Sequence, residues 1–150
     1  MVFKINLSTK DGKTYKLETE ALGLNQKQIG EKIKGEEISH DFAGYELEIT
    51  GASDLSGFTS MKDIQGFALT KALLGYGKGM HKRPKGLKKK PRQPQGGLRL
   101  RKTVRGNTIS DAMSQINIKV LKEGHKKLSE MFPEQNKPKE AAPKQEEKKE

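Results

Sequence analysis

Apolar and polar residues alternate in three short stretches of the N-terminal third. Residues 2–8 and 14–18 follow this pattern, and a turn at Asp11–Gly12 separates them. Two alternating runs joined by a glycine-containing turn are typical of a β-hairpin. Residues 45–50 alternate in the same way up to Gly51, which predicts a third strand. We therefore expect the N-terminal third to form a small antiparallel β unit.

Two further stretches have weaker patterns. Gly23 and Gly30 interrupt the apolar positions between residues 21 and 33, which leaves room for at most a short helical turn. Residues 61–74 fit either a short helix or a strand followed by a turn at Gly75. For this stretch we predict only partial burial of the apolar side chains.

The strand pattern returns in the C-terminal half. Residues 98–105 carry leucine or valine at 98, 100 and 104 and arginine at 99, 101 and 105. This alternation predicts a strand with one apolar side and one strongly basic side, which ends at Gly106–Asn107. Residues 116–121 predict the last strand, which Gly124 stops. We expect the basic side of the 98–105 strand to face the partner of this protein.

The end of the chain is polar. Residues 126–132 fit one or two helical turns. From Pro133 onward the chain is rich in Lys, Glu, Pro and Ala, and it has too few apolar side chains to form a core. We expect a solvated, disordered tail. The predicted fold class is thus mostly β, with this tail attached.

The composition allows one modest core. Hydrophobic residues make up 31% of the 150 residues, and adding glycine gives about 42%, slightly below the globular norm. The absence of cysteine excludes a disulfide framework, a thiolate metal site and a cysteine nucleophile. The start of the chain has no apolar leader, and no later run approaches about 18 apolar residues. We expect a cytoplasmic protein with no membrane partner.

The net charge of +11 is distributed very unevenly along the chain. Residues 1–63 have a net charge of −3 and residues 111–150 a net charge of +1. Between them, residues 64–110 hold 13 Lys and Arg and no acidic residue. Such a stretch concentrates positive potential where a polyanion would bind. Nucleic acid is therefore the expected partner.

A long basic arm, residues 76–97, lies inside this acid-free stretch. Glycine and proline interrupt it repeatedly, and Met80 and Leu87 are the only sizeable apolar side chains between residues 78 and 97. Two such side chains cannot offset an ordering entropy of roughly 1–2 kcal/mol per residue. We expect residues 78–97 to be disordered until a partner binds.

Twelve cations and one histidine within 28 residues form the candidate RNA-binding site. A solvated charge run or a localisation signal would also explain them. Glycine and proline, however, let the backbone follow a groove while Lys and Arg meet phosphates. Aromatic residues are nearly absent here, which favours phosphate and shape contacts over base stacking. The residues are Lys78, His81, Lys82, Arg83, Lys85, Lys88, Lys89, Lys90, Arg92, Arg99, Arg101, Lys102 and Arg105.

Patterns that suggest a cofactor or a metal are weak. Glycines at 75, 77 and 79 alternate, but a dinucleotide loop needs a further glycine that opens a helix and an acidic residue about 20 positions later. The three histidines, at 40, 81 and 125, are far apart and lack a metal-ligand spacing. We expect neither a cofactor nor a metal.

Catalytic chemistry has no clear candidate either. Asp54 and Asp63 could be imagined as paired carboxylates, but both lie in turn-like sequence, where Asp commonly caps its own backbone. The serines at 53, 56 and 60 lack a nucleophile-elbow pattern. We predict no catalytic residue, no enzymatic activity and no small-molecule substrate.

Two motifs resemble one protein family. Residues 49–58, Ile-Thr-Gly-Ala-Ser-Asp-Leu-Ser-Gly-Phe, resemble a signature of the S-six-e family, the eukaryotic/archaeal type of small-subunit ribosomal protein six. Residues 101–110, Arg-Lys-Thr-Val-Arg-Gly-Asn-Thr-Ile-Ser, look like that family's basic block as it occurs in archaea. Ala52 stands where the family has a second glycine, and Thr59–Ser60 stand where it has Pro-Met. The resemblance covers about residues 1–124.

The resemblance implies a β-barrel-like body over residues 1–124 that includes the arm, followed by a short helical turn and the tail over residues 125–150. It also implies a structural constituent of the small (30S) ribosomal subunit with a role in translation. The partners would be ribosomal RNA, which orders the arm, and neighbouring ribosomal proteins. An alternative is a free RNA- or DNA-binding regulator or RNA chaperone. An RNA-modifying enzyme is a third option, without a recognisable catalytic group.

Overall fold

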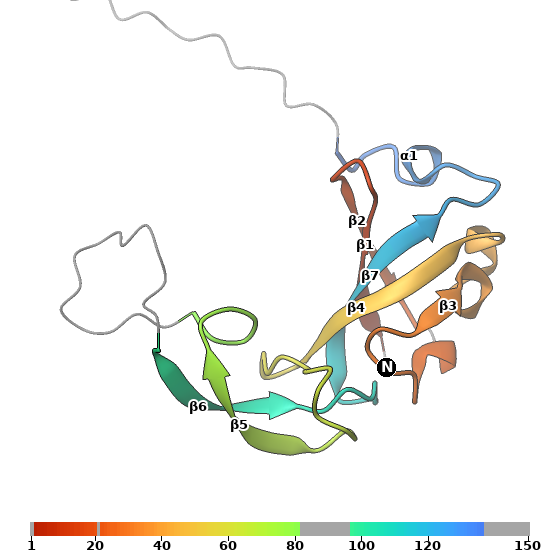
Figure 1. Ribbon diagram of the computed structural model, residues 1–150. Helices are drawn as coiled ribbons and strands as arrows, with labels where there is room; N and C mark the ends of the chain where they lie inside the picture. The colour runs from red at the N-terminus through yellow and green to blue at the C-terminus, as the bar shows by residue number, and fades with distance from the viewer. Residues whose placement is uncertain (1, 21, 82–96, 137–150) are drawn as a thin grey trace, which may run out of the picture.

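The computed structural model describes residues 2–20, 22–81 and 97–136. Within these ranges the chain forms a body built on a five-stranded sheet and a two-stranded ribbon that projects from it (Figure 1). The elements are β1 (Phe3–Ser8), β2 (Thr14–Thr19), η1 (Leu22–Leu24), β3 (Lys32–Lys34), η2 (Gly35–Glu37), η3 (His40–Phe42), β4 (Glu46–Asp54), β5 (Leu69–Gly75), β6 (Arg99–Arg105), β7 (Met113–Lys122) and α1 (Leu128–Met131).

The sheet of the body has the strand order β2-β1-β7-β4-β3. The prediction of a mostly β protein is therefore confirmed. Two details differ from the expectation: β1 and β7 are parallel, and the sheet stays open because its edge strands β2 and β3 do not pair with each other. Alternation along a strand indicates its buried face, but it gives neither the partner nor the direction of pairing.

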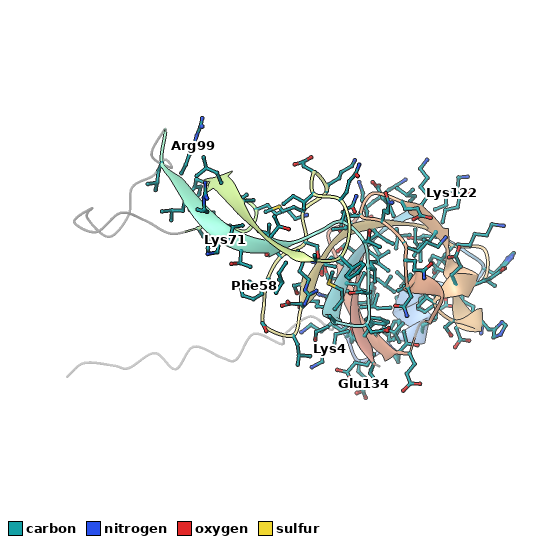
Figure 2. The ribbon with its side chains drawn as sticks, turned by 90° about the horizontal axis from the view of Figure 1, so that it is seen from below. Lys4, Phe58, Lys71, Arg99, Lys122 and Glu134 are labelled. Carbon is teal, nitrogen blue, oxygen red and sulfur yellow. The ribbon has the colours of Figure 1, made fainter. Side chains whose placement is uncertain are left out.

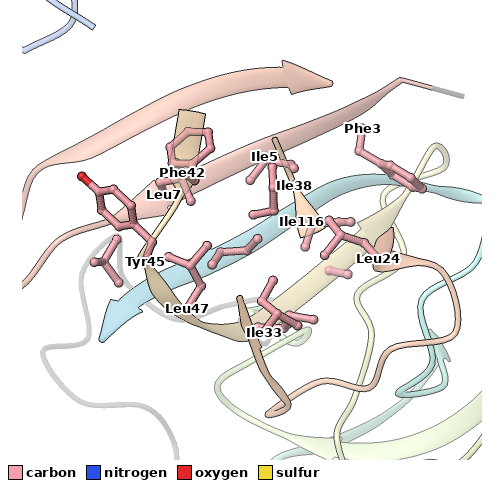
Figure 3. Close-up of a cluster of buried hydrophobic side chains, with 14 of the residues drawn as sticks. Phe3, Ile5, Leu7, Leu24, Ile33, Ile38, Phe42, Tyr45, Leu47 and Ile116 are labelled. Carbon is pink, nitrogen blue, oxygen red and sulfur yellow. The ribbon is translucent and has the colours of Figure 1, made fainter. Parts of the chain in front are cut away.

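One face of this sheet carries the hydrophobic core. Across four strands, Tyr15, Leu7, Ile118 and Ile49 form one continuous row of paired positions, and all four are at most 3% exposed. The short helices close the core from the side, with Phe42 of η3 among the buried residues (Figure 3). The alternation of the strands thus supplies the apolar layer that holds the body together.

The residues after β7 pack on the body. Leu128 of α1 belongs to the core, and the Tyr45 hydroxyl donates a hydrogen bond to the carbonyl of Lys126. Further on, the side-chain amide of Gln135 bonds both the N–H (2.7 Å) and the C=O (2.9 Å) of Lys16 in edge strand β2. Gln135 thus binds the body, although the sequence predicts a solvated extension from Pro133 onward. The domain boundary at residue 124 stays a prediction.

The N-terminal strands agree with the prediction, with two differences. The third predicted strand, β4, continues past Gly51 to Asp54, because register shifts on both sides of residues 51–53 let pairing with β7 resume after the glycine. For residues 21–33 the sequence predicts at most a short helical turn, which is η1. The structure adds the three-residue strand β3 after it. Three residues are too few for alternation to be recognised.

The stretch with two interpretations, residues 61–74, contains strand β5 and no helix in the part described. β5 pairs with β6 to form the ribbon. The predicted partial burial is wrong for Phe67, Leu69 and Leu73, which are 64%, 48% and 59% exposed. The reason is that, within the described residues, no second layer covers the face of the ribbon that Leu69 and Leu73 share.

Of the stretch predicted to be disordered without a partner, residues 78–81 and 97 are described, and Met80 among them is fully buried. Residues 82–96 and 137–150 lie outside the described residues, so the predicted disorder of the arm and of the tail stays a prediction.

Candidate nucleic-acid interface

The ribbon separates its residues into two faces. Directly paired positions are Leu69 with Arg105, Lys71 with Thr103, Leu73 with Arg101 and Gly75 with Arg99. Because opposed residues of an antiparallel pair project to the same side, these positions form one face. We call it the cationic face, after Lys71, Arg99, Arg101 and Arg105. It confirms the basic side predicted for residues 98–105.

The outer part of the cationic face is open to solvent. Arg99, Arg101 and Lys71 are exposed, and none of them takes part in an ion pair among the described residues. Figure 2 shows Arg99 and Lys71 on the ribbon, well away from Lys122 on the body. Their charges are therefore available to an external anion.

The other face of the ribbon is half-buried. It contains Val104, Leu100 and Leu74, and it also receives Lys102, which is paired with Ala72. The chain after β5 folds back over this face: a methyl group added to Gly79 would lie 3.3 Å from Leu74 Cδ1. Lys102, a predicted RNA-binding residue, is thus exposed on the opposite side from the three arginines.

Arg105 is held by the body. Its Nε donates to Asp54 Oδ2 at 2.8 Å, and its Nη1 donates to the carbonyl oxygen of Phe67 at 3.0 Å. The two charged side chains are only 15% and 4% exposed. Arg105 therefore joins the ribbon to the end of β4, and part of its hydrogen-bonding capacity is already used.

Asp54 is a structural carboxylate, as the sequence predicts. Its Oδ1 accepts a hydrogen bond from the N–H of Phe58 at 2.9 Å, which closes the turn after β4. Burial acts to raise the pKa of Asp54, but the hydrogen bonds from Arg105 and Phe58 and the positive charge of Arg105 outweigh it, so the pKa is lowered overall. The carboxylate stays ionised and keeps Arg105 in place.

Backbone contacts reinforce the same junction. Arg105 donates its N–H to Thr59 and accepts one at its carbonyl from Met61. At Gly106 an added methyl group would lie 1.9 Å from the carbonyl oxygen of Gly66, so only glycine fits. The ribbon is therefore fixed to the body at the end that carries Leu69 and Arg105.

The two remaining described candidates lie beyond β5. Lys78 Nζ approaches the carbonyl oxygen of Thr50 at 3.4 Å, which turns this side chain back toward β4. His81 is exposed, with its ring edge-on to Tyr76 at a centroid distance of 6.0 Å. The other candidates lie outside the described residues: Lys82, Arg83, Lys85, Lys88, Lys89, Lys90 and Arg92.

Lys71 joins the cationic face although it is not among the RNA-binding residues predicted from the sequence. It precedes the Gly/Pro-rich arm, and the fold of residues 61–74 is ambiguous from the pattern alone. A strand predicted over residues 69–75 would have identified Lys71, because positions 69, 71 and 73 of a strand share one side.

The described residues offer little for other kinds of chemistry. No group of three or more His, Asp or Glu side chains that could hold a metal ion occurs among them. Within the same part of the chain, no helix is both long and apolar enough to cross a membrane.

Comparison with known proteins gives a consistent result. The family model of ribosomal protein S6e matches residues 3–133. The chain belongs to the ribosomal protein S6e family. The small ribosomal subunit protein eS6 of Methanosphaera stadtmanae is 42% identical over 137 residues, which cover 89% of this chain and 95% of that protein. The eS6 proteins of Methanococcus maripaludis strain C6 and Methanocaldococcus jannaschii are 42% and 39% identical, over 83% and 82% of this chain and 90% and 84% of their own lengths. This S6e-family chain is of the archaeal type.

The structure connects the two motifs on which the family resemblance depends. Asp54 comes from the first motif and Arg105 from the second, 51 positions apart, and they form the ion pair at the ribbon junction. Ala52, where the family has a second glycine, is buried in β4 and pairs with Ile116. Ser60 is fully buried, and its N–H bonds the Ala52 carbonyl at 2.9 Å. Ala52 and Ser60, which differ from the family motif, thus both take part in backbone hydrogen bonding of the body.

Proposed function

We propose that this S6e-family chain is a structural component of the small ribosomal subunit and binds ribosomal RNA through the cationic face and the basic arm. The observation that carries this proposal is the outer cationic face, where Lys71, Arg99 and Arg101 lie together without an acidic neighbour in residues 64–110. Cations gathered this way bind phosphates by Coulomb attraction and by release of condensed counterions. The methanogen relatives are named as small ribosomal subunit proteins, which supports the proposed assignment to that subunit.

The geometry assigns different tasks to the arginines. Arg99 and Arg101 are exposed on the outer part of the ribbon, form no ion pair within the described residues, and are the primary phosphate ligands. Arg105 keeps the ribbon attached through Asp54. The segment between β5 and β6 connects the two strands at this outer end, so its cations would extend the same positive surface.

The test measures how binding to a small-subunit ribosomal RNA transcript depends on salt. Arg99→Gln and Arg101→Gln, made in the full chain, should each reduce the slope of log affinity against log salt by about 1. The matched control is Lys10→Gln with Lys13→Gln, which removes two exposed charges near the β1–β2 turn of the body. Equal effects of the ribbon and body variants would contradict the proposal.

A second measurement separates the subunit component from a free RNA-binding regulator. Tagged chain is expressed in a methanogen and lysates are sedimented through sucrose at high magnesium. A subunit component co-sediments with small subunits, and the Arg99→Gln, Arg101→Gln double variant shifts toward the top of the gradient. A chain that stays off the subunit peak would contradict the ribosomal placement and support the regulator.

A further inference from the structure

A cavity of about 280 Å³ opens where the ribbon meets the body. Three distant segments form it: the turn after η1, the residues before β5 and the residues before β7. Its volume is near the lower limit of about 300–1,000 Å³ for small-molecule sites, so it suits one small flat group. The lining includes Asn25, Phe67, Thr108, Ile109, Ser110 and Asp111.

Phe67 gives this cavity an aromatic wall. The side chain is 64% exposed, while its backbone carbonyl is held by Arg105 at 3.0 Å. A fixed backbone with an open ring is a ready stacking surface, and Ile109 adds apolar lining. The scarcity of aromatic residues in the arm predicts little base stacking there, but Phe67 lies outside the arm, beside Arg105 at the base of the ribbon.

The polar part of the lining is rich in acceptors. Asn25 Nδ2 donates to Asp111 Oδ1 at 2.8 Å, which fixes both side chains. Asn25 Oδ1 and Ser110 Oγ are buried and have no hydrogen-bond partner among the described residues. Both atoms are shielded from solvent, so the acceptor that a ligand in the open cavity can reach is the exposed carboxylate of Asp111. A ligand that binds this carboxylate would present N–H donors.

We propose that the cavity holds one unstacked RNA base, with guanine favoured. This inference rests on the proposed RNA-binding function. The Asp111 carboxylate disfavours a phosphate inside the cavity, whereas the adjacent cationic face attracts the phosphates outside it. Guanine presents an N–H and an amino group side by side, and a carboxylate accepts from both. Adenine and cytosine present an amino group beside a ring acceptor, and uracil has a single N–H donor.

The test compares RNA hairpins that differ in one bulged nucleotide: G, A, C, U or none. Binding to the full chain is measured by fluorescence anisotropy at fixed salt. The G-bulged hairpin should bind about tenfold more tightly than the hairpin without a bulge, because stacking of one base contributes an effect of that size. Phe67→Ala should remove this gain, and Phe67→Tyr should keep it. Asp111→Asn should remove the preference for G over the other bulges.

Leu55→Ala is the matched control, because Leu55 is 85% exposed in a turn that does not line the cavity. If Arg101→Gln weakens binding to every hairpin while the bulge makes no difference, the RNA-binding function stands and the base site is overturned. If Phe67→Ala leaves RNA binding unchanged but weakens co-sedimentation with the subunit, the cavity takes a protein side chain and the base site is again overturned. If no hairpin binds at all, the proposed function itself fails.

Discussion

The body and the ribbon are both made of alternating strands, yet they are stabilised in different ways. In the body, paired rows of side chains across four strands are buried against helices and turns, and Ile118 is fully buried. In the ribbon, Leu69 and Leu73 stay about half exposed beside arginines. The body contains its own core, whereas the cationic face of the ribbon lacks a covering layer within the described chain.

An isolated two-stranded sheet is marginally stable in water. This ribbon depends on its junction with the body, where Asp54, Arg105 and Gly106 make the decisive contacts. The same alternation of apolar and polar residues can therefore build either a core or a binding surface. What decides between them is whether a second layer covers the strand.

The largest effect is expected from a cavity in the body. Ile118→Ala removes a fully buried side chain and should lower the free energy of unfolding by about 3–5 kcal/mol. The matched change in the ribbon, Leu73→Ala, should alter it by less than about 0.5 kcal/mol, because this side chain is 59% exposed. Urea unfolding followed by circular dichroism measures both. Similar losses would mean that the ribbon is as well packed as the body.

A smaller but substantial effect is expected at the junction. Asp54→Ala leaves the guanidinium of Arg105 largely buried without its carboxylate, so the free energy of unfolding should fall by about 2–3 kcal/mol. The control is Glu46→Ala, which breaks the exposed pair of Glu46 and Lys122 and should cost less than about 1 kcal/mol. A double variant of Asp54 and Arg105 that loses the full sum of the single effects would show that the pair is not coupled.

The pH dependence of stability checks the same junction. A carboxyl group whose pKa is lowered by folding stabilises the protein above its unfolded pKa of about 3.9, and this stability is lost as the pH falls through the folded value. As the pH falls below 5, the free energy of unfolding should therefore decrease more for the wild-type protein than for Asp54→Asn. Glu31, whose pKa is lowered by the N–H of Gln28, is present in both proteins and contributes equally. Parallel pH curves would exclude a role for Asp54.

The smallest effect is expected at the edge of the body. Gln135→Ala removes the side-chain amide that satisfies both backbone groups of Lys16, at a cost of about 0.5–1.5 kcal/mol. The Lys16 amide should then exchange its hydrogen about 5- to 10-fold faster in an exchange experiment monitored by NMR. Exchange at Ile5, inside the sheet, serves as the control. An unchanged exchange rate at Lys16 would show that Gln135 does not protect the backbone of edge strand β2.

Local alternation predicted much of the fold and one face of the site. It gave the first hairpin, the strands at β4, β6 and β7, and the separation of Arg99 and Arg101 from Leu100. These predictions succeed because the side-chain period of a strand depends only on neighbouring residues. The structural role of Asp54 also followed from its turn-like surroundings.

Contacts between distant segments could not be predicted in this way. The parallel pairing of β1 with β7 and the ion pair of Asp54 with Arg105 each join residues that the local pattern treats as independent. The same holds for the cavity beside Phe67, whose walls come from three segments. A strand pattern indicates that a side will be covered, but the covering residues are determined by the assembled fold.

The two different faces of the ribbon limit which deletions and insertions β6 can tolerate. Deletion of one residue between Arg101 and Arg105 would rotate every preceding side chain of β6 to the opposite surface, so Arg99 and Arg101 would change places with Leu98 and Leu100. Loss of two residues would preserve the surfaces and only shorten the ribbon. Length variation among related genes should therefore occur in steps of two within β6.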